Sequence, residues 1–306
     1  MKEWASAPRE EPSRSRLGAS QTRSGIMYRV AARWGCEVAD GNGYFAADAD
    51  LDDEAARLRL IEQGSDPGTF QRLVRLGVTA GWRCLEVGAG AGSVAAWLSD
   101  QVGPTGHVVA VDIDTRHLDW LTAQNVTVRA HDIVADDLET RHYDLVHCRA
   151  VVEHLHDPER AMDQMASALR SGGWLMTEGA DFGQYRSVNE RHPLALVFDS
   201  VMSRTFSFIK DAHIFDPFIA KFLPRLLEDA GLEHIEVEMD TTAVQGGEPM
   251  AVMFETSWQR FDPVLTARGI LTEAEAAVRH EAHHDPTFAF RSGAVAAWGR
   301  HREVHL

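Results

Sequence analysis

Short apolar runs alternate with helical patterns through the middle of the chain. Cys84, Leu85 and Val87 form one run, and a second, His107–Asp112, ends in a carboxylate. Between the two runs, apolar residues recur at the spacing of a helix: Val94, Trp97, Leu98 and Val102. This alternation predicts an α/β fold in which a doubly wound sheet carries helices on both faces.

The helix expected near residue 158 has a clear start. Asp157 can cap its first turn, and Pro158 suits the first helical position. Met162, Met165 and Leu169 then give the helix an apolar stripe. We interpret this stripe as core packing rather than as a cofactor site.

Two segments extend the chain beyond a minimal α/β domain. Residues 246–285 predict a helical pair, and residues 181–222 predict a helix with apolar positions at Leu194, Val197, Phe198, Val201 and Met202. Insertions at the carboxyl end of a parallel sheet lie over its ligand crevice. We therefore expect a helical cap that shapes an acceptor pocket, with a dimer interface as the alternative.

The predicted organisation has four parts. Residues 1–26 are poor in large apolar side chains, which predicts a disordered leader, and their acidic residues argue against a targeting signal. Residues 27–75 predict short helical segments that cover the binding site. We expect residues 76–180 to form the binding core, and residues 181–306 to form the cap helices and the last strands of the sheet.

A glycine-rich turn follows the first apolar run. Gly88, Gly90 and Gly92 remove three β-carbons between a strand and a helix, so that a ligand can press against the backbone. Asp112, which ends the next run about twenty residues later, is placed where a carboxylate binds a ribose diol. The two features together predict a nucleoside site.

The composition of the chain indicates which kinds of molecule it can bind. The chain has 306 residues, 44% of them apolar, and a formal charge of −16. Nucleic-acid affinity depends on clustered Lys and Arg, so we expect no nucleic-acid partner and favour a small or neutral acceptor. The sequence contains no apolar run of the ~18–20 residues that cross a bilayer. Cys36, Cys84 and Cys148 are too scattered for a disulfide framework, which suits the cytoplasm.

Four blocks in order resemble the class I S-adenosylmethionine-dependent methyltransferases. The first is the Gly88-x-Gly90-x-Gly92 turn, and the others are Asn125–Ile133, Tyr143–Leu155 and Leu169–Met176. The resemblance is to the small-molecule branch, which includes quinone-biosynthesis and natural-product enzymes. It implies a mostly parallel, seven-stranded Rossmann-like sheet and S-adenosylmethionine as the cofactor.

The resemblance also implies the cofactor-binding residues. Gly88, Ala89 and Gly90 would lie against the methionine part and the ribose, and Glu86 belongs to the same motif. The remaining positions are Asp112 for the ribose hydroxyls, Ile113, Asp132 and Ile133 for adenine, Arg149 beside the sulfonium, Tyr44 closing over the cofactor, and Gln63 as a nearby polar group.

Methyl transfer to an alcohol, phenol or carbon acid benefits from a general base. Among the 15 histidines, His154 falls in the expected active-site loop after the fourth strand, and its alternative role is to orient that loop. Glu178 and Asp181, at the end of the fifth strand, are the other candidates.

Two features of the sequence could suggest a metal site or a nucleic-acid substrate, and neither matches the known pattern. His280, His283, His284 and Asp285 are grouped like metal ligands, but their order matches no zinc motif and Pro286 ends the segment, so we expect no metal. The fourth strand lacks the proline-aromatic sequence with which base-modifying enzymes hold a flipped nucleotide.

The sequence therefore predicts O- or C-methylation of a small molecule, in secondary metabolism. Two alternatives stay open: an enzyme that retains the cofactor and catalyses a cyclisation or isomerisation, and a non-catalytic binding protein. The acceptor is not identified, and a homo-oligomer stays open.

Overall fold

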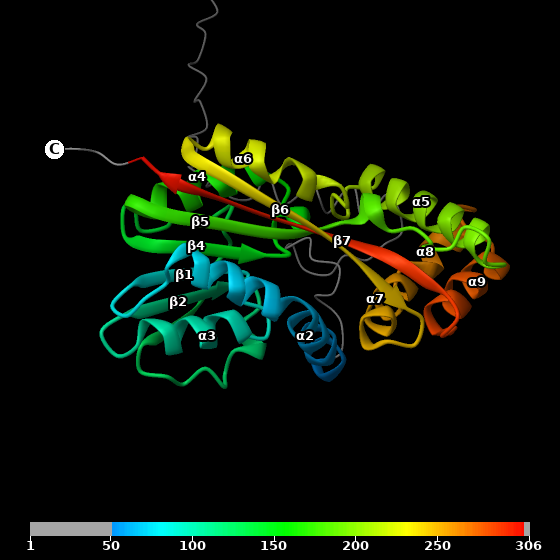
Figure 1. Ribbon diagram of the computed structural model, residues 1–306, viewed down its shortest axis with the longest axis horizontal. Helices are drawn as coiled ribbons and strands as arrows, with labels where there is room; N and C mark the ends of the chain where they lie inside the picture. The colour runs from blue at the N-terminus through cyan, green and yellow to red at the C-terminus, as the bar shows by residue number, and fades with distance from the viewer. Residues whose placement is uncertain (1–50, 303–306) are drawn as a thin grey trace, which may run out of the picture.

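The computed structural model describes residues 51–302 of the chain, which form a seven-stranded sheet with helices on both sides (Figure 1). The strand order is β3-β2-β1-β4-β5-β7-β6, and only the pairings of β7 with β5 and β6 are antiparallel. This confirms the predicted doubly wound, mostly parallel α/β fold. The strands are β1 Arg83–Val87, β2 His107–Asp112, β3 Val126–Ala130, β4 Tyr143–Arg149, β5 Leu169–Asp181, β6 Leu232–Gln245 and β7 Ala289–His301.

Successive strand residues face opposite sides of the sheet and so supply two cores. Leu85 and Val146 belong to a cluster covered by α4 (Pro158–Ala168) and α6 (Leu223–Asp229). Their neighbours on the same strands, including Cys84, pack on the other side against α3 (Ser93–Val102). The central parallel strands β1, β2 and β4 are thus buried on both faces.

The start of α4 agrees with the prediction, whereas its end does not. The Asp157 side chain accepts a hydrogen bond from the Arg160 amide at 3.1 Å, and Met162 and Met165 are fully buried. Leu169, expected in the helix stripe, is instead the first residue of β5. The register between β4 and β5 then shifts after Leu169, next to Gly172 with its positive φ of 73°.

Strands β5, β6 and β7 run beyond the parallel sheet into a second, helical lobe (Figure 1). This lobe contains α5 Ala195–Asp211, α7 Pro249–Gln259, α8 Asp262–Ala267 and α9 Glu273–His284. The segment 246–285 therefore forms three helices, not the expected pair, because the chain turns at Arg260 and Phe261 before α8 begins at Asp262. Aromatic rings fill the core of this lobe.

Helix α2, Leu51–Leu76, precedes the sheet and lies along one side of it (Figure 1). It is continuous through Pro67, so residues 51–75 are helical as expected but belong to one long helix rather than to short segments. The rest of that expectation, residues 27–50, falls outside the described residues. No helix in the described range is both long enough and apolar enough to cross a membrane.

Candidate active site

A large pocket opens at the carboxyl ends of β1, β2 and β4, with α2 as one wall. It encloses about 1410 Å³ of space, a figure that includes open solvent at its mouth. The predicted residues that line it are Glu86, Gly88, Ala89, Gly90, Asp112, Ile113, Asp132, Ile133, Arg149 and His154.

The other predicted residues lie elsewhere. Gln63 is exposed, while its neighbour Glu62 lines the pocket, because consecutive residues of a helix point in different directions. Glu178 and Asp181 are buried and do not line the pocket. Tyr44 lies outside the described residues.

The glycine turn brings backbone to the pocket wall. Gly88 has a positive φ of 68°, and a β-carbon there would lie 2.2 Å from Cγ2 of Val151. Gly90 has a φ of 58°, and a β-carbon there would meet only Leu58, at 3.8 Å. The two glycines are therefore needed for different reasons: Gly88 for lack of space, and Gly90 for its backbone conformation.

Asp112 holds this turn in place. Its Oδ2 accepts a hydrogen bond from the Gly90 amide at 2.9 Å, and its Oδ1 accepts one from the Asp114 amide at 3.0 Å. Burial raises the pKa of Asp112, and these amide donors oppose that rise. Each carboxylate oxygen keeps acceptor capacity that a hydroxyl could use.

The next loop is built around Asp132. Its Oδ1 accepts from the Val134 amide at 2.9 Å, which closes a tight turn. From α4, Gln164 donates to the Ile133 carbonyl at 2.9 Å and thereby fixes the loop. Ile133 is buried, and Ile113 is 38% exposed, so the pocket has apolar side chains on two of its loops.

Polar contacts attach α2 to this edge of the sheet. The Arg149 guanidinium donates to Asp66 at 2.8 Å and to Thr69 at 2.9 Å. At the start of α3, the Ser93 amide donates to Glu62 at 3.0 Å and its hydroxyl to Asp66 at 3.0 Å. Arg149 thus lines the pocket while it binds α2.

A buried charge cluster lies behind the pocket wall. The ring of His147 lies between the carboxylates of Glu86, at 2.7 Å, and Glu178, at 3.3 Å. Glu178 also accepts from Thr69 at 2.6 Å and from Arg72 at 3.0 Å. His147 was not expected as a site residue, because an isolated histidine in an apolar strand gives no signal that carboxylates flank it.

His154 lies in a single 3-10 turn, Val152–His154, after β4. Its ring is 5.4 Å from that of Phe215, measured between centroids. Burial, and then the nearby Arg57, lower the pKa of His154 to about 3. The imidazole is therefore neutral near pH 7, although a pKa this far below 7 makes it a weak base in this state.

The helices of the second lobe contribute no residue to the described pocket wall. They border it indirectly, since Arg260 donates to Glu54, a pocket residue on α2, at 3.1 Å. The expectation that this lobe shapes the acceptor pocket stays a prediction.

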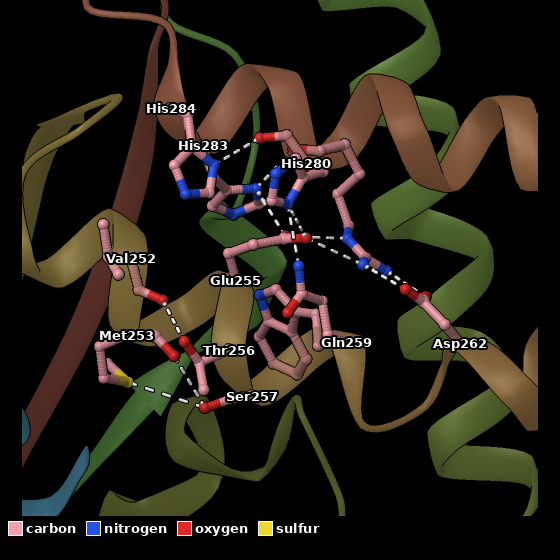
Figure 2. A network of polar contacts seen from close by, with 12 residues as sticks. Val252, Met253, Glu255, Thr256, Ser257, Gln259, Asp262, His280, His283 and His284 are labelled. Carbon is pink, nitrogen blue, oxygen red and sulfur yellow. Dashed lines mark hydrogen bonds and ion pairs between the residues drawn. The ribbon is translucent and has the colours of Figure 1, made fainter. Parts of the chain in front are cut away.

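The histidine-rich segment belongs to α9 of this second lobe (Figure 2). His283 points inward, 3.1 Å from Glu255 and 2.6 Å from the Tyr185 hydroxyl, whereas the rings of His280 and His284 lie side by side with centroids 4.3 Å apart. Among residues 51–302 no group of three or more His, Cys, Asp or Glu is arranged to hold a metal ion. Figure 2 shows that Glu255 is the centre of the network.

The chain was compared with known protein families and structures. Residues 44–237 match the family model that is described as a methyltransferase domain. No curated protein matches the sequence.

Among solved structures, phosphoethanolamine N-methyltransferase 2 of Haemonchus contortus, in complex with S-adenosyl-L-methionine, is 14% identical with a TM-score of 0.55. The match covers 88% of this chain and 61% of that one. A proposed methyltransferase of Bacillus halodurans is 17% identical with a TM-score of 0.51, covering 76% of this chain and 98% of that one. At these identities the likeness concerns the fold.

Proposed function

The chain belongs to the S-adenosylmethionine-dependent methyltransferases, and on this premise we propose that it methylates a small-molecule acceptor in the pocket beside β1, β2 and β4. The single observation that carries the proposal is that the glycine turn and Asp112 meet, hydrogen-bonded, in the wall of one large pocket. That pairing is suited to a nucleoside.

The residues of the pocket fit the cofactor. Gly90 leaves open backbone where a ligand can approach, and Asp112 has oxygen lone pairs for the ribose hydroxyls. Ile113 and Ile133 offer apolar contacts to a flat ring, with Asp132 beside them as an acceptor for an amino group. The Glu86 carboxylate in the wall suits a cationic ligand.

When bound, the cofactor supplies an electrophilic methyl group on a sulfonium. The protein's part is mainly to orient the acceptor, which can contribute ~7–11 kcal/mol in principle. Leu58 and Ile61 on α2 and Val151 after β4 supply apolar surface to hold an acceptor.

We assign His154 to the acceptor side as the general base. It lines the pocket next to Val151 and Leu155, on a different loop from Asp112 and Asp132. His154→Ala should lower kcat by roughly 10²-fold while the affinity for S-adenosylhomocysteine stays constant. Because the pKa of His154 lies near 3, the His154 ring should cause no change in rate between about pH 5 and pH 8.

A rival role for His154 predicts a different pattern. If its ring only packs on Phe215 to orient the loop, then thermal stability and cofactor affinity should fall together with the rate in the same variant. A wild-type kcat would contradict both roles and direct the search for a base to Glu178 and Asp181.

Charge and cysteine content bear on the class of acceptor and on the cellular compartment of the reaction. The net charge of −16 supports a small or neutral acceptor over nucleic acid. The free, buried thiols of Cys84 and Cys148 support the reducing cytoplasm as the place of action. We place the reaction in secondary metabolism, on the resemblance to natural-product enzymes.

Mass spectrometry tests the function directly. Purified protein is incubated with a small-molecule extract and S-adenosylmethionine carrying an isotopically labelled methyl group, with Asp112→Ala as the control. We expect a labelled product and an equal amount of S-adenosylhomocysteine, both dependent on the protein. Intact cofactor with a changed extract would point instead to a cyclase or isomerase.

A further inference from the structure

The buried ring of His147 joins three strands through two carboxylates. His147 on β4 is inaccessible to solvent, with Nδ1 2.7 Å from Glu86 on β1 and Nε2 3.3 Å from Glu178 on β5. A neutral imidazole has one N–H, whereas the protonated ring has two and can donate to both carboxylates. The geometry therefore favours an imidazolium between two carboxylates.

The two carboxylates depend on His147 to different degrees. Glu178 has further donors on α2, since Thr69 and Arg72 bind it at 2.6 and 3.0 Å. Within the described residues, the side chain of Glu86 has one hydrogen-bond partner, which is His147. Burial raises the pKa of Glu86, and the adjacent His147 is the main group that lowers it again.

Glu86 is also the member of the cluster that reaches the pocket. Its charge state therefore changes the electrostatics of the ligand site, whereas His147 and Glu178 do not line the pocket. We propose that His147 is a positioning residue that keeps Glu86 ionised and oriented toward the cationic cofactor. This inference rests on the proposed function.

The charges around His147 support a protonated ring. Although burial opposes protonation, Glu86 and Glu178 raise the pKa of His147 to about 9. The guanidiniums of Arg149 and Arg72 are also close to the cluster, but Asp66 binds the first, and Glu238 and Asp240 bind the second. A buried charge is tolerated only when it is paired in this way.

Binding measurements over pH test the inference. Calorimetric titration with S-adenosylhomocysteine, from about pH 6 to about pH 8, should give a constant affinity for the wild type, because Glu86 stays ionised. His147→Gln should bind about tenfold more weakly or worse at the low end, where its buried Glu86 is protonated. Its affinity should then recover as pH rises.

Two variants separate charge from structure. Glu86→Gln should bind weakly at every pH, without the recovery expected for His147→Gln. His107→Gln is the matched control: His107 begins β2, contacts Thr127 at 3.0 Å, and lies outside the pocket wall. It should keep the affinity and the flat profile of the wild type.

A second readout needs neither a His147 variant nor a ligand. In protein labelled with ¹⁵N-histidine, one ring should keep both N–H groups above pH 8 in the wild type, and Glu86→Gln should lower the pKa of that ring. This spectrum decides the question even where His147→Gln does not fold.

Three outcomes are distinguishable. The predicted profiles and spectrum support the inference. Wild-type affinity with a flat profile in folded His147→Gln, or a neutral His147 ring at pH 7, overturns it alone and leaves the methyltransferase function intact. A wild type that binds no S-adenosylhomocysteine at any pH refutes the proposed function together with this inference.

Discussion

Gly88 and Gly90 are equivalent in the sequence motif but not in the structure. At Gly88 a β-carbon would overlap Val151, whereas at Gly90 it would make an ordinary contact with Leu58. Both have positive φ, which disfavours any residue with a β-carbon. The motif indicates that a glycine is needed at each position, and only the fold tells which neighbour requires it.

This difference predicts an order of stability. Gly77→Ala serves as the reference, because φ there is 86° and a β-carbon would meet nothing within 4 Å. It should cost about 1–2 kcal/mol of unfolding free energy through backbone strain alone. Gly90→Ala should match it, and Gly88→Ala should cost clearly more. Equal losses for Gly88→Ala and Gly77→Ala in urea unfolding would contradict the close approach of Val151.

We assign two tasks to Asp112, one of which the sequence predicts. The motif spacing assigns it to the ribose, and the structure adds that it accepts the Gly90 amide. Asp112→Ala should therefore lower cofactor affinity more than tenfold, by about 1.5–3 kcal/mol, and also lower thermal stability. Calorimetry and thermal unfolding measure the two effects.

Asp112→Asn and Asp100→Ala complete this comparison. Asn keeps an acceptor for Gly90 but turns an NH2 group toward the Asp114 amide, so it should retain more stability than Ala while affinity still falls. Asp100 is exposed on α3, and its loss should change neither quantity. If Asp112→Ala bound the cofactor as well as the wild type, Asp112 would not be its ribose ligand.

At the level of elements, local patterns predicted strands better than helices. The run His107–Asp112 coincides with β2, since its alternating faces are all buried in the parallel sheet. Helix α2 runs unbroken through Gly64, Pro67 and Gly68, although all three are poor helix formers. Contacts of Asp66 with Ser93 and Arg149 stabilise it there, and they join residues distant in sequence.

Helices α7 and α9 are linked by a buried ion pair (Figure 2). Arg279 donates to Glu255 at 3.0 and 3.1 Å and to Asp262 at 2.8 and 2.9 Å, and its side chain is fully buried. Arg279→Met should cost about 3–5 kcal/mol because it leaves a buried carboxylate without its main partner. The double variant Glu255→Gln/Arg279→Met should recover part of that loss.

Chemical unfolding measures these differences, with Arg225→Met as the control. Arg225 pairs with Asp229 on the surface, where an ion pair contributes about 1 kcal/mol or less. A loss for Arg279→Met no larger than for the control would contradict the role of the buried pair.

The same pair predicts a pH dependence. Although burial opposes ionisation, His283 and Arg279 lower the pKa of Glu255 from its usual 4.5 to about 2. A lowered pKa stabilises the fold above the unfolded value, so this contribution should be lost as pH falls from 4.5 through 2. Thermal unfolding of the wild type and of Glu255→Gln should converge in that range.

At the scale of the whole molecule, two lobes share three long strands (Figure 1). The parallel sheet and its pocket follow from repeated local patterns, and the sequence predicted both. The packing of the second lobe depends on contacts between segments far apart in the chain, such as Tyr185 with His283. Such contacts leave no local pattern, which is why the helix count and the position of His283 were not predicted.

The most direct test of the account is a crystal structure of the full chain with S-adenosylhomocysteine. We expect the ribose hydroxyls to hydrogen-bond with Asp112, the adenine to lie between Ile113 and Ile133, and the amino-acid part to lie against Gly88 with its ammonium toward Glu86. A ligand bound outside this pocket, or one whose ribose does not contact Asp112, would contradict the account.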